Sequence, residues 1–579
     1  MVSFSYLLAL SSTAAAANIV ANIPVSPKSA SPEAATNGVT VGQPLDGFVS
    51  YSIEFSSFPD FAGNLSKPNT FSNNLLNNLG YVIGTKPYIR VGGNTQDYYI
   101  FNSTQKQGLI GTVNATRSPD YPTTISIGPA YFESFETWPG TRFSYGFNLG
   151  GNNYSAATIR STLESTAQYA CRTLGTDKLY LYEYGNEPDL YSTASFPVRN
   201  NANWTDEAYV EQWLNGTRFI KSVIEEACPE QLSGSSPAYA YMAPSFGGVG
   251  NHLKQPGVWE AGLDTDKDIK YASTHNYISG ATSPGVTLQG TLMNHTRTVS
   301  SIAAHVSEFA NITASGSAPP SLVQIFGETN SLYNEGAPGL SNSFGAALWG
   351  IDFALYSASV GIGRVHFHQG TNYRYQSWQP IETDIEPKGT KAPYYGNVAT
   401  AAFLGNLKIA PVRIASVEVT AANTDTNTAS GAKTGIVASA AGSNVTSEPI
   451  SAELDVVYSA YVNDTLARLM VINLRAYNYT LNGTGDLTQL NPVPRPEQTY
   501  TFGVELANGT EIGVRRLYAN GSDAISGIAW DGVSYNYELA NGLPVRLHNI
   551  TTGETAKVKN GEVQVLVPDS QAVVLDFHH

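Results

Sequence analysis

Two glutamates that follow apolar segments are the residues of this 579-residue chain best suited to do chemistry. Glu187 stands in segment 178–190, KLYLYEYGNEPDL, and Glu328 stands in segment 322–330, LVQIFGETN. Each follows a run typical of a buried strand, so neither is placed like an ordinary solvated carboxylate. Two carboxyl groups that meet in one cleft could protonate a leaving oxygen and attack a sugar carbon, which is the chemistry of glycoside hydrolysis.

The elements that must bring these glutamates together are strand-like segments that alternate with helical ones from about residue 48. Helical periodicity covers 155–174, 206–227, 291–312 and 341–360. The alternation predicts an α/β fold, namely a closed (β/α)8 TIM barrel. Its eight predicted strands are 48–55, 87–93, 142–150, 178–188, 238–247, 269–278, 322–330 and 363–370.

The carboxyl ends of the strands form the catalytic face of such a barrel. Glu187 ends the fourth strand and Glu328 the seventh, so both would face one cleft although 141 positions separate them. From opposite walls their oxygens would lie roughly 5 to 5.5 Å apart, the spacing of retaining glycosidases. We therefore assign Glu187 as acid/base and Glu328 as nucleophile, and expect the charge of Glu328 to raise the pKa of Glu187. The amide of Asn186 suits the sugar 2-hydroxyl.

The chain divides into four parts by pattern. Residues 1–17 resemble a signal peptide, and residues 18–45 form an N-terminal segment expected to add a strand to the second domain. Residues 46–405 are the predicted barrel. Residues 406–579 lose the helical periodicity and show short alternating runs, which predicts a C-terminal antiparallel β-sandwich with a loop at 421–447.

Several features predict a secreted, extracellular protein. The leader ends in Ala15-Ala-Ala17, and its apolar run is too short to span a bilayer, although it lacks a basic residue at its start. The sequence holds fifteen Asn-x-Ser/Thr sites, so N-linked glycans are expected. Cys171 and Cys228 both lie in predicted helices, and either one bridge or two buried thiols fits the sequence.

Charge and motifs exclude other classes of function. A net charge of -15 argues against nucleic acid or an anionic membrane as partner. The sequence has neither a nucleophile elbow nor a nucleotide-binding glycine pattern. His366 and His368 have the alternate spacing of metal ligands on a strand, but no companion cluster accompanies them. We therefore expect no metal and no cofactor.

Longer segments carry a family resemblance. GNEP at 185–188 and GETN at 327–330 resemble the acid/base and nucleophile signatures of the large clan of retaining barrel glycosidases. IRVGGNTQDYYIF at 89–101, THNYISG at 274–280, the stretch 327–344 and QGTNYRY at 369–375 resemble glycoside hydrolase family 79. That family contains β-glucuronidases and heparanases, and the resemblance runs from about residue 45 to the C-terminus.

The resemblance implies a substrate-binding set around the carboxylate pair. Tyr277 would hydrogen-bond the nucleophile, and His275 lies on the same strand face. Tyr373 would bind the glucuronate carboxylate together with backbone amides of segment 333–336, and Glu54 would bind sugar hydroxyls. The set, with Asn186 from the reasoning above, is Glu54, Asn94, Asn186, His275, Tyr277, Tyr333, Gly336 and Tyr373.

Arg90 lies near the floor of the same cleft, and two roles remain open for it: pairing with a buried carboxylate, or binding the substrate directly. Asn334 and Glu335 depart from the consecutive glycines of heparanases. An inward Glu335 would repel an acidic substrate, which argues against endo-action on a polyanion.

The predicted function is that of an exo-acting, retaining β-glucuronidase. Its substrate would be terminal glucuronate, with or without a 4-O-substituent, on glycans or small conjugates. Two alternatives remain: an endo-acting heparanase-like hydrolase, which a positively charged open groove would favour, and a non-catalytic glycan-binding or cell-wall protein.

Overall fold

The computed structural model describes residues 17–21, 41–235, 237–417, 419–421, 451–463 and 465–577. Apart from Ala17, the expected signal peptide lies outside these ranges. The expected loop 421–447 also lies outside them, apart from Ala421.

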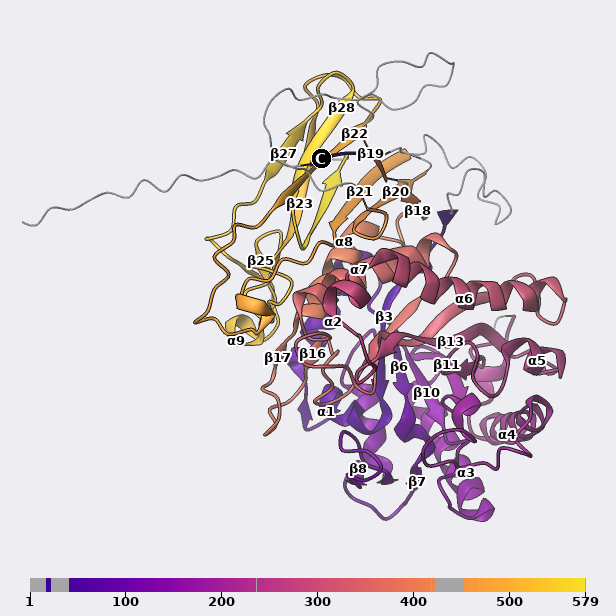
Figure 1. Ribbon diagram of the computed structural model, residues 1–579. Coiled ribbons are helices and arrows are strands. Elements are labelled where there is room, and N and C mark those ends of the chain that lie inside the picture. The colour runs from indigo at the N-terminus through magenta and orange to yellow at the C-terminus, as the bar shows by residue number, and fades with distance from the viewer. Residues whose placement is uncertain are drawn as a thin grey trace, which may run out of the picture.

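Eight parallel strands close into a barrel, and helices surround it (Figure 1). The predicted TIM barrel is therefore confirmed. In order around the barrel the strands are β3 (Val49–Glu54), β6 (Ile89–Gly92), β10 (Phe143–Phe147), β11 (Leu179–Tyr184), β12 (Tyr241–Phe246), β13 (Ile269–Gly280), β14 (Val323–Tyr333) and β15 (Val365–Gln369).

Polar N-caps set the starts of the main helices. Ser155, Thr205, Asn294 and Ser343 each accept a hydrogen bond from a backbone N–H of the following first turn. The cap at Asn294 explains why the helix predicted over 291–312 begins later, after a short π-helical turn. The barrel helices are α1 (Phe58–Ala62), α2 (Thr70–Ile83), α3 (Ala156–Leu174), α4 (Asp206–Ala227), α5 (Gln255–Glu260), α6 (His295–Ala314), α7 (Phe344–Ser359) and α8 (Ala392–Leu404).

One connection departs from strict strand–helix alternation. Between β6 and β10 the chain forms a small sheet in place of an α-helix: β7 (Tyr99–Phe101), β8 (Leu109–Thr112) and β9 (Thr124–Ile127). Two further two-stranded sheets, β4 (Gly63–Asn64) with β5 (Lys67–Pro68) and β16 (Trp378–Gln379) with β17 (Gly389–Thr390), decorate other loops.

The C-terminal part forms two sheets, antiparallel except where β1 joins, which confirms the predicted antiparallel β domain. One sheet has the order β19 (Val419–Ala421), β1 (Ala17–Ala21), β22 (Glu497–Gly503) and β28 (Glu562–Pro568), so a strand of the N-terminal segment lies within it. The larger sheet contains β2 (Val41–Gly42), β18 (Val412–Val417), β20 (Asp455–Val462), β21 (Thr465–Asn473), β29 (Gln571–Asp576), β23 (Glu511–Tyr518), β24 (Ala529–Trp530), β25 (Val533–Ser534), β26 (Val545–Arg546) and β27 (Glu554–Lys557), and the short helix α9 (Tyr537–Ala540) follows β25.

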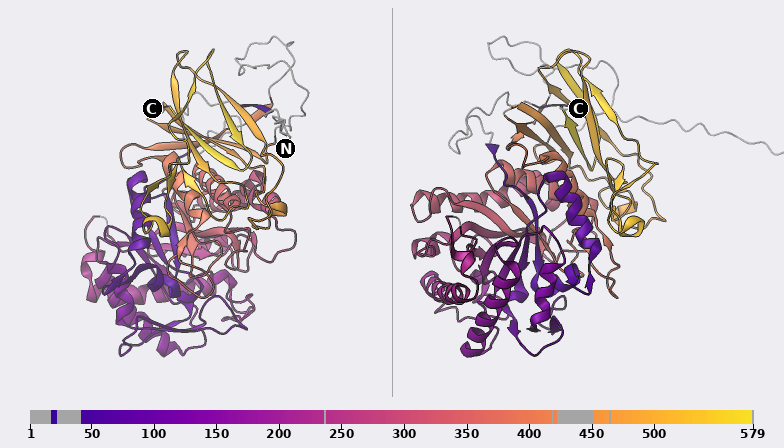
Figure 2. Two further views of the ribbon diagram at one scale, coloured as in Figure 1. Left: turned by 90° about the vertical axis from the view of Figure 1, so that its left-hand side faces the viewer. Right: turned by 180° about the vertical axis from the view of Figure 1, so that it is seen from behind.

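Helices α7 and α8 lie between the barrel and the sheets (Figure 1), and both views of Figure 2 show the β domain packed against one side of the barrel. Almost every residue of the two helices is buried. The hydroxyl of Tyr458 on β20 donates to the Asp352 carboxylate of α7 at 2.7 Å, and Arg468 on β21 donates to the carbonyl of Leu404 at the end of α8 at 2.9 Å. One apolar core therefore runs from the barrel into the β domain.

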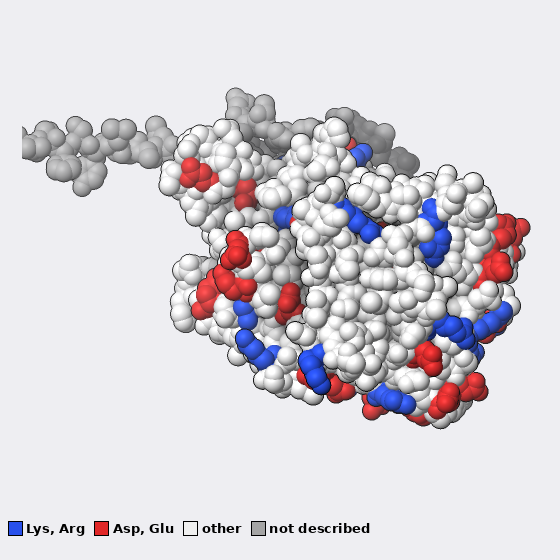
Figure 3. Space-filling view, turned by 90° about the horizontal axis from the view of Figure 1, so that it is seen from below, with Lys and Arg blue, Asp and Glu red and all other residues white. Residues whose placement is uncertain are grey.

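The face drawn in Figure 3 is mostly uncharged, with acidic and basic side chains interspersed. Within the described ranges, no helix combines the length and the hydropathy that a membrane span needs.

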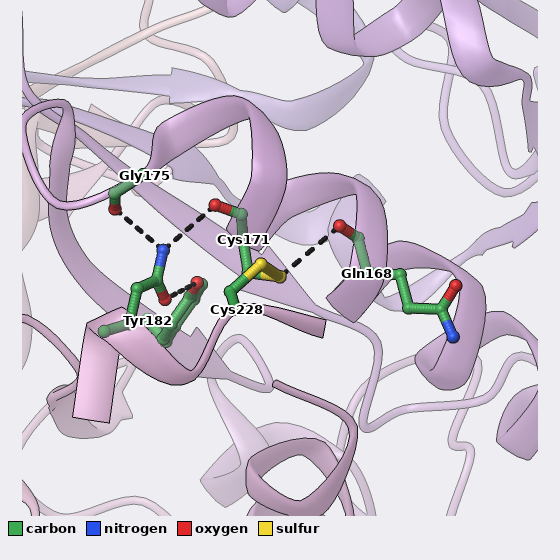
Figure 4. The surroundings of a disulfide bond; sticks show 6 residues. Gln168, Cys171, Gly175, Tyr182 and Cys228 are labelled. Carbon is green, nitrogen blue, oxygen red and sulfur yellow. Dashed lines mark hydrogen bonds between the residues drawn. A yellow bond between two sulfur atoms is a disulfide. The ribbon is translucent and has the colours of Figure 1, made fainter. Parts of the chain in front are cut away.

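A disulfide joins Cys171 on α3 to Cys228 at the end of α4 (Figure 4). This answers the question that the sequence left open. Gln231 lies beside the bridge: its amide donates to the carbonyl oxygens of Cys171 and Gly175 at 3.0 and 2.7 Å, and it accepts from the Tyr182 hydroxyl at 2.7 Å. The bridge thus ties two outer helices to each other and, through Gln231, to β11 of the barrel.

Candidate active site

Glu187 and Glu328 lie at the carboxyl end of the barrel, as the topology requires. Glu187 follows β11, and Glu328 is the middle residue of the long strand β14. Both side chains line one cavity. One carboxyl oxygen of each glutamate and one ring nitrogen of His275 all lie within 4.8 Å of one another. A single pyranose ring can bridge such a gap.

The backbone of Glu187 is in the left-handed region, with φ 49° and ψ 50°. Its N–H donates to the carbonyl of Ser245 on β12 at 3.0 Å, which holds this conformation. Non-glycine residues rarely adopt such angles, and they persist where the surrounding structure imposes them. The turn ends the strand and directs the carboxyl group across the barrel mouth.

The surroundings of Glu187 favour its protonated form. Burial raises its pKa most, and the charge of Glu328 raises it further, to about 8. His275 Nδ1 lies 2.8 Å from Glu187 Oε1. Burial also lowers the pKa of His275 to about 4, so this histidine is neutral at ordinary pH and adds no positive charge that would oppose the shift. The charge of Glu328 thus raises the pKa of Glu187 as expected, but burial raises it more.

The surroundings of Glu328 favour the ionised form. Burial alone would raise its pKa, but His368, His275, the Arg90 guanidinium and a hydrogen bond from Tyr277 lower it to about 2. Of these partners Arg90 is permanently charged, and its Nη1 lies 2.5 Å from Glu328 Oε2. The Tyr277 hydroxyl donates to Glu328 Oε1 at 2.8 Å. Both oxygens of Glu328 are thus held in place.

Arg90 is fully buried and does not line the cavity. Its guanidinium pairs with Glu183 at 2.8 Å as well as with Glu328, and donates to Asn186 Oδ1 at 2.7 Å. Of the two roles left open, carboxylate pairing is therefore the one observed. We did not predict Glu183, although a charged residue inside an apolar strand signals that it needs a buried partner.

Glu54, His368 and Tyr373 form a second polar group in the cavity. The Tyr373 hydroxyl donates to Glu54 Oε2 at 3.3 Å. The two ring nitrogens of His368 lie 3.4 Å from Glu54 and 3.5 Å from Glu328. His368 thus links the Glu54 side of the cavity to Glu328, a contact that the sequence analysis did not anticipate.

Asn94 and Asn186 line the same cavity side by side, with Asn186 Nδ2 donating to Asn94 Oδ1 at 3.2 Å. Asp97, which no prediction named, accepts hydrogen bonds from the Asn186 N–H at 3.0 Å and from the Tyr191 hydroxyl at 2.6 Å. It fixes the residue that precedes Glu187. The sequence signal for Asp97 is its place in the quoted segment 89–101.

The cavity has a volume of about 750 Å³, larger than one sugar needs. Tyr333 lies at its exposed rim, whereas Gly336 is buried and is not among the lining residues. A side chain at Gly336 would meet Ser341 and the Tyr375 nitrogen within 3 Å. Lining residues that the sequence analysis did not single out include Tyr98, Arg117, Tyr121, Phe196, Asn251 and Tyr375.

Three consecutive residues after β14 adopt left-handed backbone angles. Their φ values are 61° at Asn334, 59° at Glu335 and 79° at Gly336. Arg374 binds the carbonyl oxygens of all three: its N–H donates to residue 335 at 2.7 Å, and its guanidinium donates to residues 334 and 336 at 3.2 and 3.1 Å. Within the described ranges these three N–H groups have no acceptor. Successive free N–H groups of a turn can form a concavity that binds an anion.

Glu187, His275 and Glu328 are spaced closely enough to contact a cation. Their donor atoms are already engaged with one another, with Tyr277 and with Arg90. The guanidinium beside Glu328 would repel a metal ion, so this donor set suits proton transfer better than metal binding.

The chain is similar to several known proteins. The profile of the glycosyl hydrolase family 79 C-terminal beta domain matches residues 457–574. The chain is 53% identical over 532 residues to a β-glucuronidase of Neurospora crassa, covering 90% of each chain. It is 49% identical over 537 residues to a β-glucuronidase of Aspergillus niger, covering 92% of this chain and 91% of that one.

Solved structures share the fold. A 4-O-α-L-rhamnosyl-β-D-glucuronidase from Fusarium oxysporum 12S, in complex with Rha-GlcA, superposes with a TM-score of 0.69 at 22% identity, covering 96% of this chain and 100% of that one. A GH51 arabinofuranosidase from Xanthomonas axonopodis pv. citri superposes with a TM-score of 0.54 at 13% identity, covering 93% and 98%.

Proposed function

Since the chain belongs to glycosyl hydrolase family 79, with β-glucuronidases among its near relatives, it is a β-glucuronidase, and we propose that it removes terminal glucuronate with retention of configuration. One observation carries the proposal. The carboxyl groups of Glu187 and Glu328 lie within 4.8 Å of each other, and their surroundings shift their pKa values in opposite directions. Such a pair has one acid and one carboxylate ready at the same pH.

In the first step Glu328 attacks the anomeric carbon while Glu187 gives its proton to the glycosidic oxygen. The bond between C1 and the leaving oxygen breaks, and an ester between C1 and Glu328 forms. The ester removes the charge that had helped to keep Glu187 protonated. Glu187 then accepts a proton from water, and the water oxygen attacks C1. The ester bond between C1 and Glu328 breaks, which restores the Glu328 carboxylate, and glucuronate leaves in the β configuration.

Recognition of the glucuronate carboxylate is proposed at the left-handed run 334–336. Asn334 and Glu335 line the cavity, and their N–H groups belong to the concavity described above. A carboxylate seated there would complete the hydrogen bonds of the run. The hydroxyl of Tyr373 lies in the same cavity and could donate to the same group.

Exo-action is supported by the charge of the cavity. Among its lining residues in the described chain, Arg117 is the single Lys or Arg, whereas Glu54, Asp97, Glu187, Glu328 and Glu335 are acidic. A polyanionic chain that passed through would need a row of cations. The endo-acting, heparanase-like alternative therefore has no support here.

The test is hydrolysis of an aryl β-glucuronide, followed by proton NMR of the first product formed. Retention predicts β-glucuronate before mutarotation, and Glu328→Gln removes the activity. An α product would refute the roles given to the two glutamates, and a wild-type protein inactive on every β-glucuronide would refute the function.

We also propose that the protein is exported and carries N-linked glycans. The leader, the fifteen acceptor sites and the Cys171–Cys228 disulfide all suit an oxidising compartment. Mass spectrometry of the purified protein should find Asn18 as the first residue and glycosylated peptides. An unprocessed, unmodified chain would contradict the proposal.

A further inference from the structure

Glu335 is an acidic side chain in a pocket that is to hold an acidic sugar. It lines the cavity, only 13% of its side chain is exposed, and it belongs to the run 334–336 whose N–H groups are proposed to receive the glucuronate carboxylate. An ionised glutamate at this place would repel the substrate. The proposed reaction assigns no role to this side chain.

Three charged groups face Glu335. Arg374, from the loop after β15, lies 3.8 Å from Glu335 Oε2 and pairs more closely with Asp120, at 2.5 Å. Asp120 precedes β9 and interacts with Glu335 directly, and Glu54 at the end of β3 adds a weaker negative charge. The Arg374 guanidinium thus lies near two carboxyl groups and pairs mainly with that of Asp120.

The neutral groups around this cluster are hydroxyls. Tyr121, Tyr373 and Tyr375 line the cavity beside Glu335, and burial raises the pKa of each well above its usual range, so they remain protonated. The charge at this end of the cavity therefore changes when Glu335 gains or loses a proton. Burial and the charge of Asp120 raise the pKa of Glu335 to about 8.

We propose that Glu335 is a specificity-determining residue that admits glucuronate when its carboxyl group is protonated and excludes it when ionised. The inference rests on the proposed function. In the protonated state the charges of Arg374 and Asp120 cancel, and the Glu335 carboxyl group adds no negative charge beside the substrate carboxylate. In the ionised state a second negative charge lies beside the bound carboxylate, and the anion loses affinity.

The test uses Glu187→Gln, which blocks turnover and removes the other carboxyl group of the cavity whose pKa is raised to about 8. Calorimetric titrations with glucuronate and with its uncharged analogue glucuronamide are compared between pH 6 and pH 9. We expect affinity for glucuronate to fall about tenfold or more as pH rises, as two like charges a few ångströms apart require. Affinity for glucuronamide should change less than about twofold, because it has no charge to repel.

Adding Glu335→Gln should abolish the pH dependence for glucuronate while keeping the shape of the side chain. The matched control is Glu164→Gln on the exposed face of α3, the same change of charge outside the cavity, which should leave the pH dependence intact. Asp120→Asn should move the midpoint to lower pH, because it removes a charge that raises the pKa of Glu335. A purely structural role for Glu335 would not produce this shift.

Two results would overturn the inference: an unchanged pH dependence after Glu335→Gln, or an equal pH dependence for glucuronamide. Hydrolysis of an aryl β-glucuronide by the wild type is measured alongside. If hydrolysis is normal and either result appears, the inference alone fails. If the wild type neither hydrolyses β-glucuronides nor binds glucuronate, the proposed function fails with it.

Discussion

Replacing Glu328 by glutamine removes a negative charge next to Glu187 and keeps the size of the side chain. The two carboxyl groups lie within 4.8 Å of each other, and the pKa of Glu187 is raised to about 8 by burial first and by Glu328 second. At 4.8 Å and an effective dielectric constant of about 20, Coulomb's law gives about 3.5 kcal/mol. That energy corresponds to about 2.5 pKa units.

We therefore expect the pKa of Glu187 to fall to between about 5 and 6 in Glu328→Gln, because burial still raises it while the positive charges of Arg90 and His368 oppose burial. The measurement is a carbon-13 NMR titration of the protein with labelled glutamate carboxyl groups, in which Glu187→Gln identifies the resonance. Glu54→Gln provides the comparison, because Glu54 also raises the pKa of Glu187 but by less. Its effect should be smaller than that of Glu328→Gln.

Refutation would be a pKa of Glu187 that stays near 8 in Glu328→Gln. Burial alone would then account for the shift, and formation of the glycosyl ester could not convert Glu187 from acid to base. The reasoning would also be wrong if Glu54→Gln lowered the pKa of Glu187 as much as Glu328→Gln does. The shift would then not depend on how close each carboxyl group lies to Glu187.

Three further perturbations follow from the same contacts. Glu187→Gln should lower kcat/KM by about 10²- to 10⁴-fold on substrates with a poor leaving group and by much less on activated aryl glucuronides, which need little protonation; paired kinetics on the two substrate types check this. Tyr277→Phe should raise the pKa of Glu328 by removing a hydrogen bond that lowers it, so the acid limb of the kcat/KM profile moves to higher pH; a limb that does not move would contradict it. Replacing Cys171 and Cys228 by serine removes a bridge that spans 57 positions. On the chain-entropy account this should lower the free energy of unfolding by about 4 kcal/mol, which urea denaturation would measure. An unchanged midpoint would show that the bridge does not stabilise the protein.

The barrel could be predicted because its strands are apolar runs that end in polar residues. Asn186 and Glu187 after β11 and the glutamate of segment 322–330 have that form, and the barrel topology alone then brings both glutamates to one face. The cap residues Ser155 and Thr205 likewise mark the helix starts in the sequence.

Other features depend on contacts between distant segments. The pairing of Arg90 with Glu183 and Glu328 joins three strands, and no spacing in the sequence specifies it. The left-handed backbone angles at Asn334 and Glu335 are stabilised by hydrogen bonds from Arg374, some forty positions away in the sequence. Such angles can be predicted from sequence where a glycine stands, but neither of these residues is a glycine. Burial raises the pKa of Glu187 more than the like charge of Glu328 does. This order also could not be predicted from the sequence, because burial depends on all the segments that form the cavity.

Helices α7 and α8 have no side that could face water, because their outer surfaces are covered by the β domain. A fragment truncated after residue 405 would expose buried apolar surface of α7 and α8 and should aggregate. We therefore expect the two domains to unfold together. An investigator who seeks a smaller enzyme cannot obtain it by trimming the C-terminal domain, although no described residue of that domain lines the catalytic cavity.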